Sequence, residues 1–136
     1  MALSKKIRSL IETGVTNFIT GGAIGFDTLA AETVLNLRDT EFSNITLSLA
    51  LPCTEQTRGW NSSQKEKYNN ILKMADNIHY VSKDYTPDCM MKRNRYMVDN
   101  SSYCIFYLLN TKSGTYKTVS YAMEQDLELI NILDKI

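Results

Sequence analysis

Short apolar segments with the character of β-strands alternate with amphipathic helical segments along the whole of this chain. A helix shows apolar residues at every third or fourth position, whereas a strand buried on both faces can be apolar throughout. The alternation predicts a three-layer, Rossmann-like α/β domain, with a mostly parallel sheet of about five strands between layers of helices. The expected strands lie near residues 15–20, 45–52, 77–82, 103–109 and 127–133, and the expected helices near 3–13, 27–40, 62–75, 88–101 and 115–125.

Size and charge narrow the classes of protein to which the chain can belong. Its 136 residues predict one domain, residues 1–136, and its 15 basic residues balance 15 acidic ones, so nucleic acid is not an expected partner. No apolar run approaches the roughly 18–20 residues that cross a bilayer, and we expect a cytoplasmic protein that does not contact membranes. Three separated cysteines and one histidine fit neither a disulfide framework nor a zinc site, so we expect buried thiols, no metal and no cofactor.

Half of the six glycines fall in one segment, "ITGGAIGFDTLAAE", residues 19–32. Gly21, Gly22 and Gly25 lie between an expected strand and an expected helix, where backbone N–H groups and the helix dipole can hold a phosphate or another anion. The spacing differs from the G-x-G-x-x-G of dinucleotide-binding domains, and a tight turn without a ligand is the alternative. A valine at Gly22 is expected to block the approach of a phosphate without unfolding the chain.

Two carboxylates follow these glycines. Asp27 is expected to cap the helix through its side chain, with contact to a ligand as the alternative. Glu32 lies more than one turn further along, where an exposed position is expected.

Two more segments belong at the same edge of the predicted sheet, because ligands of such sheets lie outside the carboxyl ends of the strands. The sequence "SGT", Ser113 to Thr115 with Gly114 between them, offers hydroxyl donors and a close backbone approach; an ordinary capped turn is the alternative. The sequence "KRNR", residues 92–95, offers two guanidinium groups for phosphate or carboxylate; a solvated helix face is the alternative. Aromatic side chains near these loops offer stacking surfaces or ordinary packing: Trp60, Tyr68, Tyr85 and Tyr107.

Four blocks carry a family resemblance over nearly the whole chain, in order: "GGAIGFDTLAAETVL", "LPCTEQTRGW", "YTPDCMMKRNRYMVDNS" and "GTYKTVSYA". Together they resemble the YpsA-like family of small bacterial and phage proteins, a branch of the SLOG superfamily. That superfamily also contains the LOG phosphoribohydrolases, which release a base from a nucleoside monophosphate, and DprA, which binds single-stranded DNA. The resemblance implies a modified Rossmann fold and the binding of a nucleotide or a nucleotide-derived ligand, as a sensor or regulatory module.

The resemblance also assigns residues. "GGAIGFD" is similar to the first loop of DprA, and Met90, Arg93, Met97 and Ser101 fall at the offsets of a LOG segment, which implies that Arg93 lies at a phosphoribosyl group. The implied ligand-binding residues are Gly21, Gly22, Ala23, Gly25, Phe26, Asp27, Arg93, Ser113, Gly114 and Thr115.

Catalysis is left open by the same comparison. Thr118 stands where LOG enzymes carry a glutamate, and a threonine cannot replace a carboxylate in acid–base chemistry, so we expect binding without turnover and assign no catalytic residue. The alternatives are a LOG-like hydrolase that uses Glu32 or Asp27, and a DprA-like binder of single-stranded DNA.

One feature of the relatives is not found. They begin with a strand and a "TGHR"-like loop, whereas this sequence starts at the helix that follows. Either a second protomer of a homo-oligomer or a rearrangement is expected to cover the exposed sheet, or the sequence is a shortened form with an impaired site.

Overall fold

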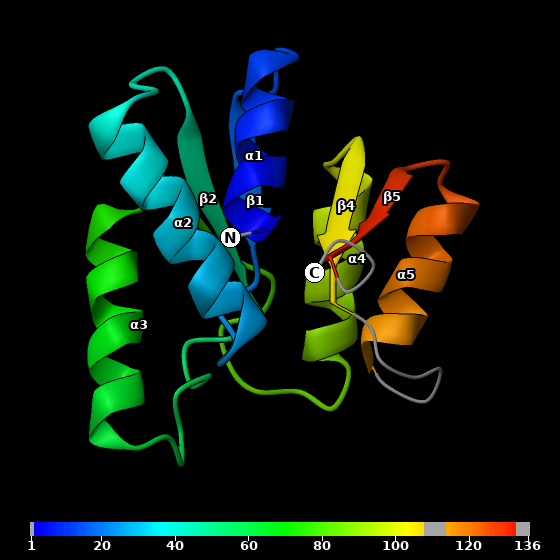
Figure 1. Ribbon diagram of the computed structural model, residues 1–136. Coiled ribbons are helices and arrows are strands. Elements are labelled where there is room, and N and C mark those ends of the chain that lie inside the picture. The colour runs from blue at the N-terminus through cyan, green and yellow to red at the C-terminus, as the bar shows by residue number, and fades with distance from the viewer. Residues whose placement is uncertain (1, 108–113, 133–136) are drawn as a thin grey trace.

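Helices and strands alternate without exception along the described chain, as the sequence predicts. The computed structural model describes residues 2–107 and 114–132 (Figure 1). The helices are α1 (Ala2–Glu12), α2 (Phe26–Thr40), α3 (Ser62–Met74), α4 (Cys89–Asp99) and α5 (Gly114–Glu124). The strands are β1 (Asn17–Thr20), β2 (Thr46–Leu51), β3 (Asn77–Tyr80), β4 (Tyr103–Phe106) and β5 (Glu128–Asn131).

The five strands form two parallel sheets, where the sequence predicts one. In the first, the order is β1-β2-β3, with Asn17 opposite Thr46 and Ser48 opposite Asn77; in the second, β4 pairs with β5. Figure 1 shows β4 beside β1, so the two sheets face each other through these edges. The α/β fold class is therefore confirmed, and the division of the sheet is a difference from the prediction.

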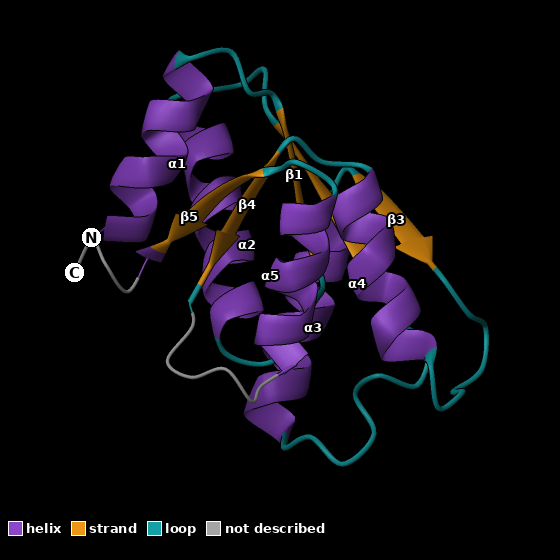
Figure 2. Ribbon diagram, turned by 90° about the vertical axis from the view of Figure 1, so that its right-hand side faces the viewer, coloured by secondary structure: helices purple, strands orange, loops and turns teal. Residues whose placement is uncertain are grey.

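Helices lie on both faces of the strands (Figures 1 and 2). α2 contacts both α1 and α3, whereas α4 contacts α5. None of the helices in the described part of the chain is long and apolar enough to span a bilayer. This layering follows from parallel β-α-β connections, which place a helix over the sheet after every strand.

The core lies between β2 and the helices α1 and α2. Leu47, Leu49 and Leu51 alternate along β2 and point to one face, where they join the apolar stripe of α1. Ile130 and Ile132, in and just after β5, belong to the same apolar cluster. One apolar core therefore contains residues of both sheets and connects them.

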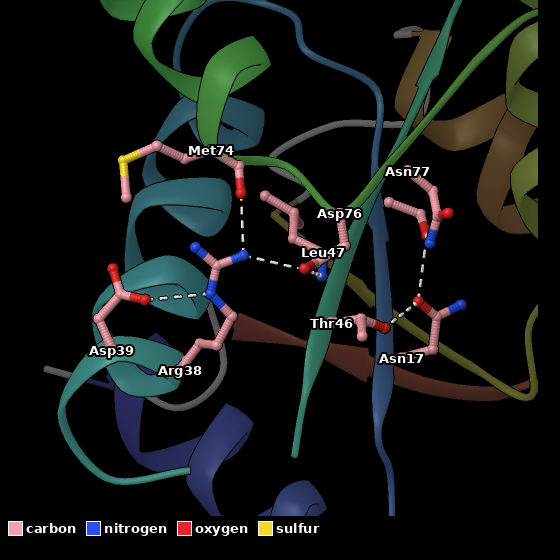
Figure 3. A network of polar contacts seen from close by, with 9 residues as sticks. Asn17, Arg38, Asp39, Thr46, Leu47, Met74, Asp76 and Asn77 are labelled. Atoms are coloured by element: carbon pink, nitrogen blue, oxygen red, sulfur yellow. Dashed lines mark hydrogen bonds and ion pairs between the residues drawn. The ribbon is translucent and has the colours of Figure 1, made fainter. Parts of the chain in front are cut away.

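A polar network fixes the amino-terminal part of the first sheet against α2 (Figure 3). Arg38 donates to the carbonyl oxygen of Met74 at 2.8 Å and to the carboxylate of Asp76 at 2.9 Å. Asp76 also accepts from the amide of Leu47 at 2.8 Å, and this bond, together with Arg38, lowers the pKa of Asp76. The entrance to β3 is thus held by the end of α2 and the start of β2.

Candidate functional site

The glycine-rich segment forms the loop between β1 and α2. Helix α2 begins at Phe26, and Gly25 precedes it with φ 89° and ψ −117°. Residues other than glycine rarely adopt this backbone conformation. The loop therefore lies at the carboxyl end of a parallel strand and at the amino terminus of a helix, as the sequence predicts. This is where open α/β sheets bind their ligands.

Arg93 of α4 packs against the start of the loop. The Arg93 side chain is only 5% exposed, and its Nη1 donates a hydrogen bond to the carbonyl oxygen of Gly21. Gln56, from the loop after β2, donates to the same carbonyl at 3.2 Å. A Cβ atom on Gly21 would lie 2.8 Å from the Arg93 Cζ and 2.9 Å from Oδ2 of Asp27, so any other residue there would require these side chains to move.

Gly22 is also enclosed by the protein's own atoms. Its φ is 70°, and a Cβ atom on it would lie 2.7 Å from a methyl group of Leu51 and 3.5 Å from the ring of Tyr68. Tyr68 packs edge-on against Trp60, and burial raises the pKa of Tyr68 to about 12. A valine at Gly22 is therefore expected to cost stability as well as to block a ligand, because the φ and the nearby Leu51 methyl group both favour glycine there.

The end of the loop is open. Nothing lies within 4 Å of the point where a Cβ atom on Gly25 would stand, and the Ile24 side chain is 48% exposed. Ala23 is partly exposed, and its carbonyl accepts a hydrogen bond from Thr28 in the first turn of α2. We call Gly21 and Gly22 the inner half of the loop, and Ala23, Ile24 and Gly25 the outer half.

Asp27 does not cap α2 in the way that the sequence predicts. The N-cap position is Gly25, which has no side chain to offer, and the Asp27 carboxylate instead accepts from the amide of Ala23 at 3.1 Å. Burial raises the pKa of Asp27, while the charge of Arg93 and the Ala23 amide act in the opposite direction. Burial likewise lowers the pKa of Arg93, and Asp27 opposes this. The two groups thus stabilise each other's charged forms beneath the loop.

Only one basic side chain of the "KRNR" segment reaches this loop. Lys92 forms an exposed ion pair with Asp88 at 3.4 Å, and Arg95 lies over the ring of Tyr121 at 5.2 Å. The predicted cluster of two guanidinium groups therefore reduces to Arg93, and the alternative of a solvated helix face holds for Lys92 and Arg95.

The end of β4 also approaches the loop. The ring of Tyr107, directly after β4, lies 6.5 Å from the ring of Phe26, the first residue of α2. Gly114 begins α5 and Thr115 is exposed in its first turn, whereas Ser113 lies outside the described residues. Their predicted role at the ligand stays a prediction, and the strand that leads toward them, β4, ends at Phe106, before the expected end near residue 109.

Other predicted positions lie apart from the loop. Glu32 is exposed on α2, and Tyr85 is 64% exposed. Met97 lies near the carboxyl end of α4 and Ser101 follows the helix, and the Ser101 hydroxyl donates to the Met97 carbonyl. They line a cavity beside β1, which Phe26 and Asp27 at the start of α2 also line.

Sequence reasoning missed Gln56 as a partner of the loop. Gln56 lies in "LPCTEQTRGW", a segment already expected at this edge of the sheet, but one glutamine among several polar residues carries no signal by itself. Its Oε1 is buried and has no hydrogen-bond partner among the described residues.

Comparisons with known proteins show the family. The YpsA family, described as the YspA SLOG family, matches residues 1–132. The chain belongs to this YpsA-like SLOG family. It is 33% identical to the uncharacterized SPbeta prophage-derived protein YoqJ of Bacillus subtilis (strain 168), over 90% of this chain and 81% of that protein. It is 26% identical to a UPF0398 protein of Bacillus thuringiensis (strain Al Hakam), over 96% of this chain and 71% of that protein. Membership supports the Rossmann-like fold.

Proposed function

We propose that this SLOG-family chain binds a nucleotide or a nucleotide-derived ligand at the outer half of the glycine loop. The observation that carries the proposal is the open space at Gly25, where no atom beyond the adjacent residues lies within 4 Å of the position of a Cβ atom, so that a phosphate has room near the first amides of α2. The helix dipole and the free N–H groups of the first turn favour a negative charge at that position. The Arg93 guanidinium, held at the Gly21 carbonyl, adds a positive charge beside the inner half of the loop.

Arg93 has a different role in this proposal from the one that the resemblance implies. Its guanidinium is engaged with the Gly21 carbonyl and the Asn94 side chain, the latter at 2.7 Å. It therefore holds the inner half of the loop in shape, and a ligand phosphate contacts backbone amides of the outer half. A rigid loop lowers the entropy that binding must overcome.

The chain acts as a binding module in this proposal, and not as a hydrolase. Asp27 is held by the Ala23 amide and Glu32 is exposed on the outer surface of α2. Neither carboxylate is presented to the open side of Gly25 as an unengaged acid. We expect no release of free base from nucleoside monophosphates, and chromatography of reaction mixtures, with Glu32→Gln beside the parent, tests this.

The binding test is isothermal titration with a panel of nucleoside monophosphates, diphosphates and ADP-ribose. For any compound that binds the parent, Gly25→Ala is expected to weaken binding at least about tenfold, because the methyl group enters the open space. The matched control is Gly14→Ala, since Gly14 has φ 108° and an equally open surrounding but lies at the opposite end of β1. Equal affinities for the two variants, or no binding by any compound of the panel, would overturn the proposal.

A further inference from the structure

Two buried thiols meet at the carboxyl edge of the first sheet, and neither has a role in the proposed binding. Cys53 follows the end of β2, and Cys89 is the first residue of α4. The two residues are 2% and 0% exposed, and their thiol groups lie within hydrogen-bond distance of each other. Residues that are far apart in the sequence thus bring two nucleophilic sulfur atoms into contact.

Backbone hydrogen bonds hold together the segments that carry these thiols. Thr54, directly after Cys53, donates to the carbonyl oxygen of Lys83 through its amide at 3.2 Å and through its hydroxyl at 2.8 Å. The amide of Cys89 donates to the carbonyl oxygen of Thr86 at 3.2 Å, in the turn that leads into α4. The loop after β2 is therefore fixed to the segment between β3 and α4, and this keeps the two thiols close.

The two thiols have different surroundings. Cys89 lies at the amino terminus of α4, where the helix dipole stabilises a thiolate. Burial lowers the pKa of Arg93, one turn further along α4, whereas the charges of Asp27 and Cys89 act in the opposite direction, so a thiolate at Cys89 attracts this cation. Burial raises the pKa of the Cys53 thiol, and the amide of Glu55 opposes this. Cys89 is therefore the better nucleophile of the pair, and Cys53 is placed to react second.

The cover over the two thiols is thin. Thr54 is exposed next to Cys53, and Asp88 and Met90 are exposed on either side of Cys89. Local opening of surface segments needs far less free energy than global unfolding, so a small uncharged reagent can reach a thiol beneath them. Burial at this depth slows a reaction of the thiols without preventing it.

We infer that Cys53 and Cys89 form a reversible disulfide when the protein meets a hydroperoxide. The Cys89 thiolate attacks one oxygen of hydrogen peroxide, the O–O bond breaks, and the released hydroxide takes up a proton and leaves as water. The sulfur of Cys53 then attacks the Cys89 sulfenic acid, the S–O bond breaks, and the hydroxyl group leaves with the Cys53 proton as a second water. Two electrons pass from the sulfur atoms to the peroxide oxygens, and a dithiol reductant reverses the change by thiol–disulfide exchange.

The disulfide would join the two segments that support the inner half of the glycine loop. Gln56, in the loop that Cys53 begins, and Arg93, in the helix that Cys89 begins, both donate to the carbonyl oxygen of Gly21. A covalent link between these segments restricts the unfolded chain and stabilises the folded one. The inference concerns the thiols alone and holds whichever ligand the outer half of the loop binds.

The test is treatment of the full chain with hydrogen peroxide, followed by alkylation of the remaining thiols and peptide mass spectrometry. We expect an intramolecular link between the peptides of Cys53 and Cys89, and a rise of at least about 5 °C in the midpoint of thermal unfolding. Dithiothreitol is expected to reverse both. Cys104→Ala is the matched control, because Cys104 lies in β4 outside the pair, and this variant is expected to behave as the parent does.

Two further variants test the order of the steps. Cys53→Ala is expected to stop at a sulfenic acid on Cys89, which dimedone labels, because no second thiol is in contact with it. Cys89→Ala is expected to react with peroxide at least about tenfold more slowly than Cys53→Ala. No disulfide in the oxidised parent, a link that includes Cys104, or a covalent dimer on a non-reducing gel would overturn the inference. The measurement on the parent needs no substitution, so it decides the matter even where a variant does not fold.

Discussion

Gly21 and Gly25 lie four residues apart in one loop, yet their surroundings are opposite. At Gly21 the space of a side chain is taken by Arg93 and Asp27, whereas at Gly25 it is empty. The inner half of the loop is thus part of the protein interior, and the outer half is a surface held in a fixed shape by that interior. The difference teaches that a glycine-rich motif can contain enclosed and open positions side by side, and substitutions separate them.

The largest effect is expected for Gly22→Val in the inner half. A left-handed conformation costs a branched side chain about 1–3 kcal/mol, and the overlap with Leu51 adds about 1–3 kcal/mol. We therefore expect a loss of about 4 kcal/mol in the free energy of unfolding, measured by urea denaturation. A loss below about 1 kcal/mol would mean that the inner half is as open as the outer half.

The second largest effect is expected for Arg93→Met. The variant removes one of two donors to the Gly21 carbonyl and the nearest positive charge to Asp27, so we expect a loss of about 3 kcal/mol in the free energy of unfolding. Arg95→Met is the matched control, because Arg95 lies over Tyr121 on the surface, and its loss is expected to stay below about 1 kcal/mol. Similar losses for both variants would contradict the support of the loop by Arg93.

The pH dependence of stability reports on Asp27. Because burial raises the pKa of Asp27 above its ordinary value near 3.8, the folded chain holds this proton more tightly than the unfolded chain. Its contribution to stability is therefore present at acid pH and is lost as the pH rises from about 3.8 through the raised pKa. Relative to Asp27→Asn, the parent is expected to lose stability across that window, measured by urea denaturation at a series of pH values. A parent that gains stability relative to the variant would show that Arg93 outweighs burial.

The order of helices and strands could be predicted from the sequence, because each apolar run carries its own period. The position of the glycine loop followed from that order, since a strand must end and a helix must begin around Gly21 to Gly25. The division into two sheets could not be predicted from periodicity alone. Which strands become neighbours depends on contacts between distant residues, such as those that place β4 beside β1.

The roles of the side chains around the loop were the feature of the site that was hardest to predict from the sequence. Asp27 is a residue type that often caps helices, but its carboxylate accepts a hydrogen bond from the Ala23 amide and interacts with the charge of Arg93. Arg93 and Arg95 are indistinguishable by type, and only the helical spacing of α4 against the first sheet buries one and exposes the other. Such choices are made by packing across the fold, which no local pattern encodes.

The smallest effect is expected for Thr20→Val, at the junction of β1 with the inner half of the loop. Thr20 is 6% exposed and its hydroxyl has no hydrogen-bond partner in the described chain, so valine, which has a similar shape, removes a desolvated polar group. We expect the free energy of unfolding to rise by about 0.5–1 kcal/mol, with the affinity for any nucleotide unchanged, because the proposed binding surface lies at Gly25 and not at Thr20. A fall of more than about 1 kcal/mol would show that the hydroxyl is bonded in the folded protein, and the boundary between the enclosed and the open part of the loop would then have to include Thr20. Urea denaturation and isothermal titration on the same preparation distinguish these outcomes.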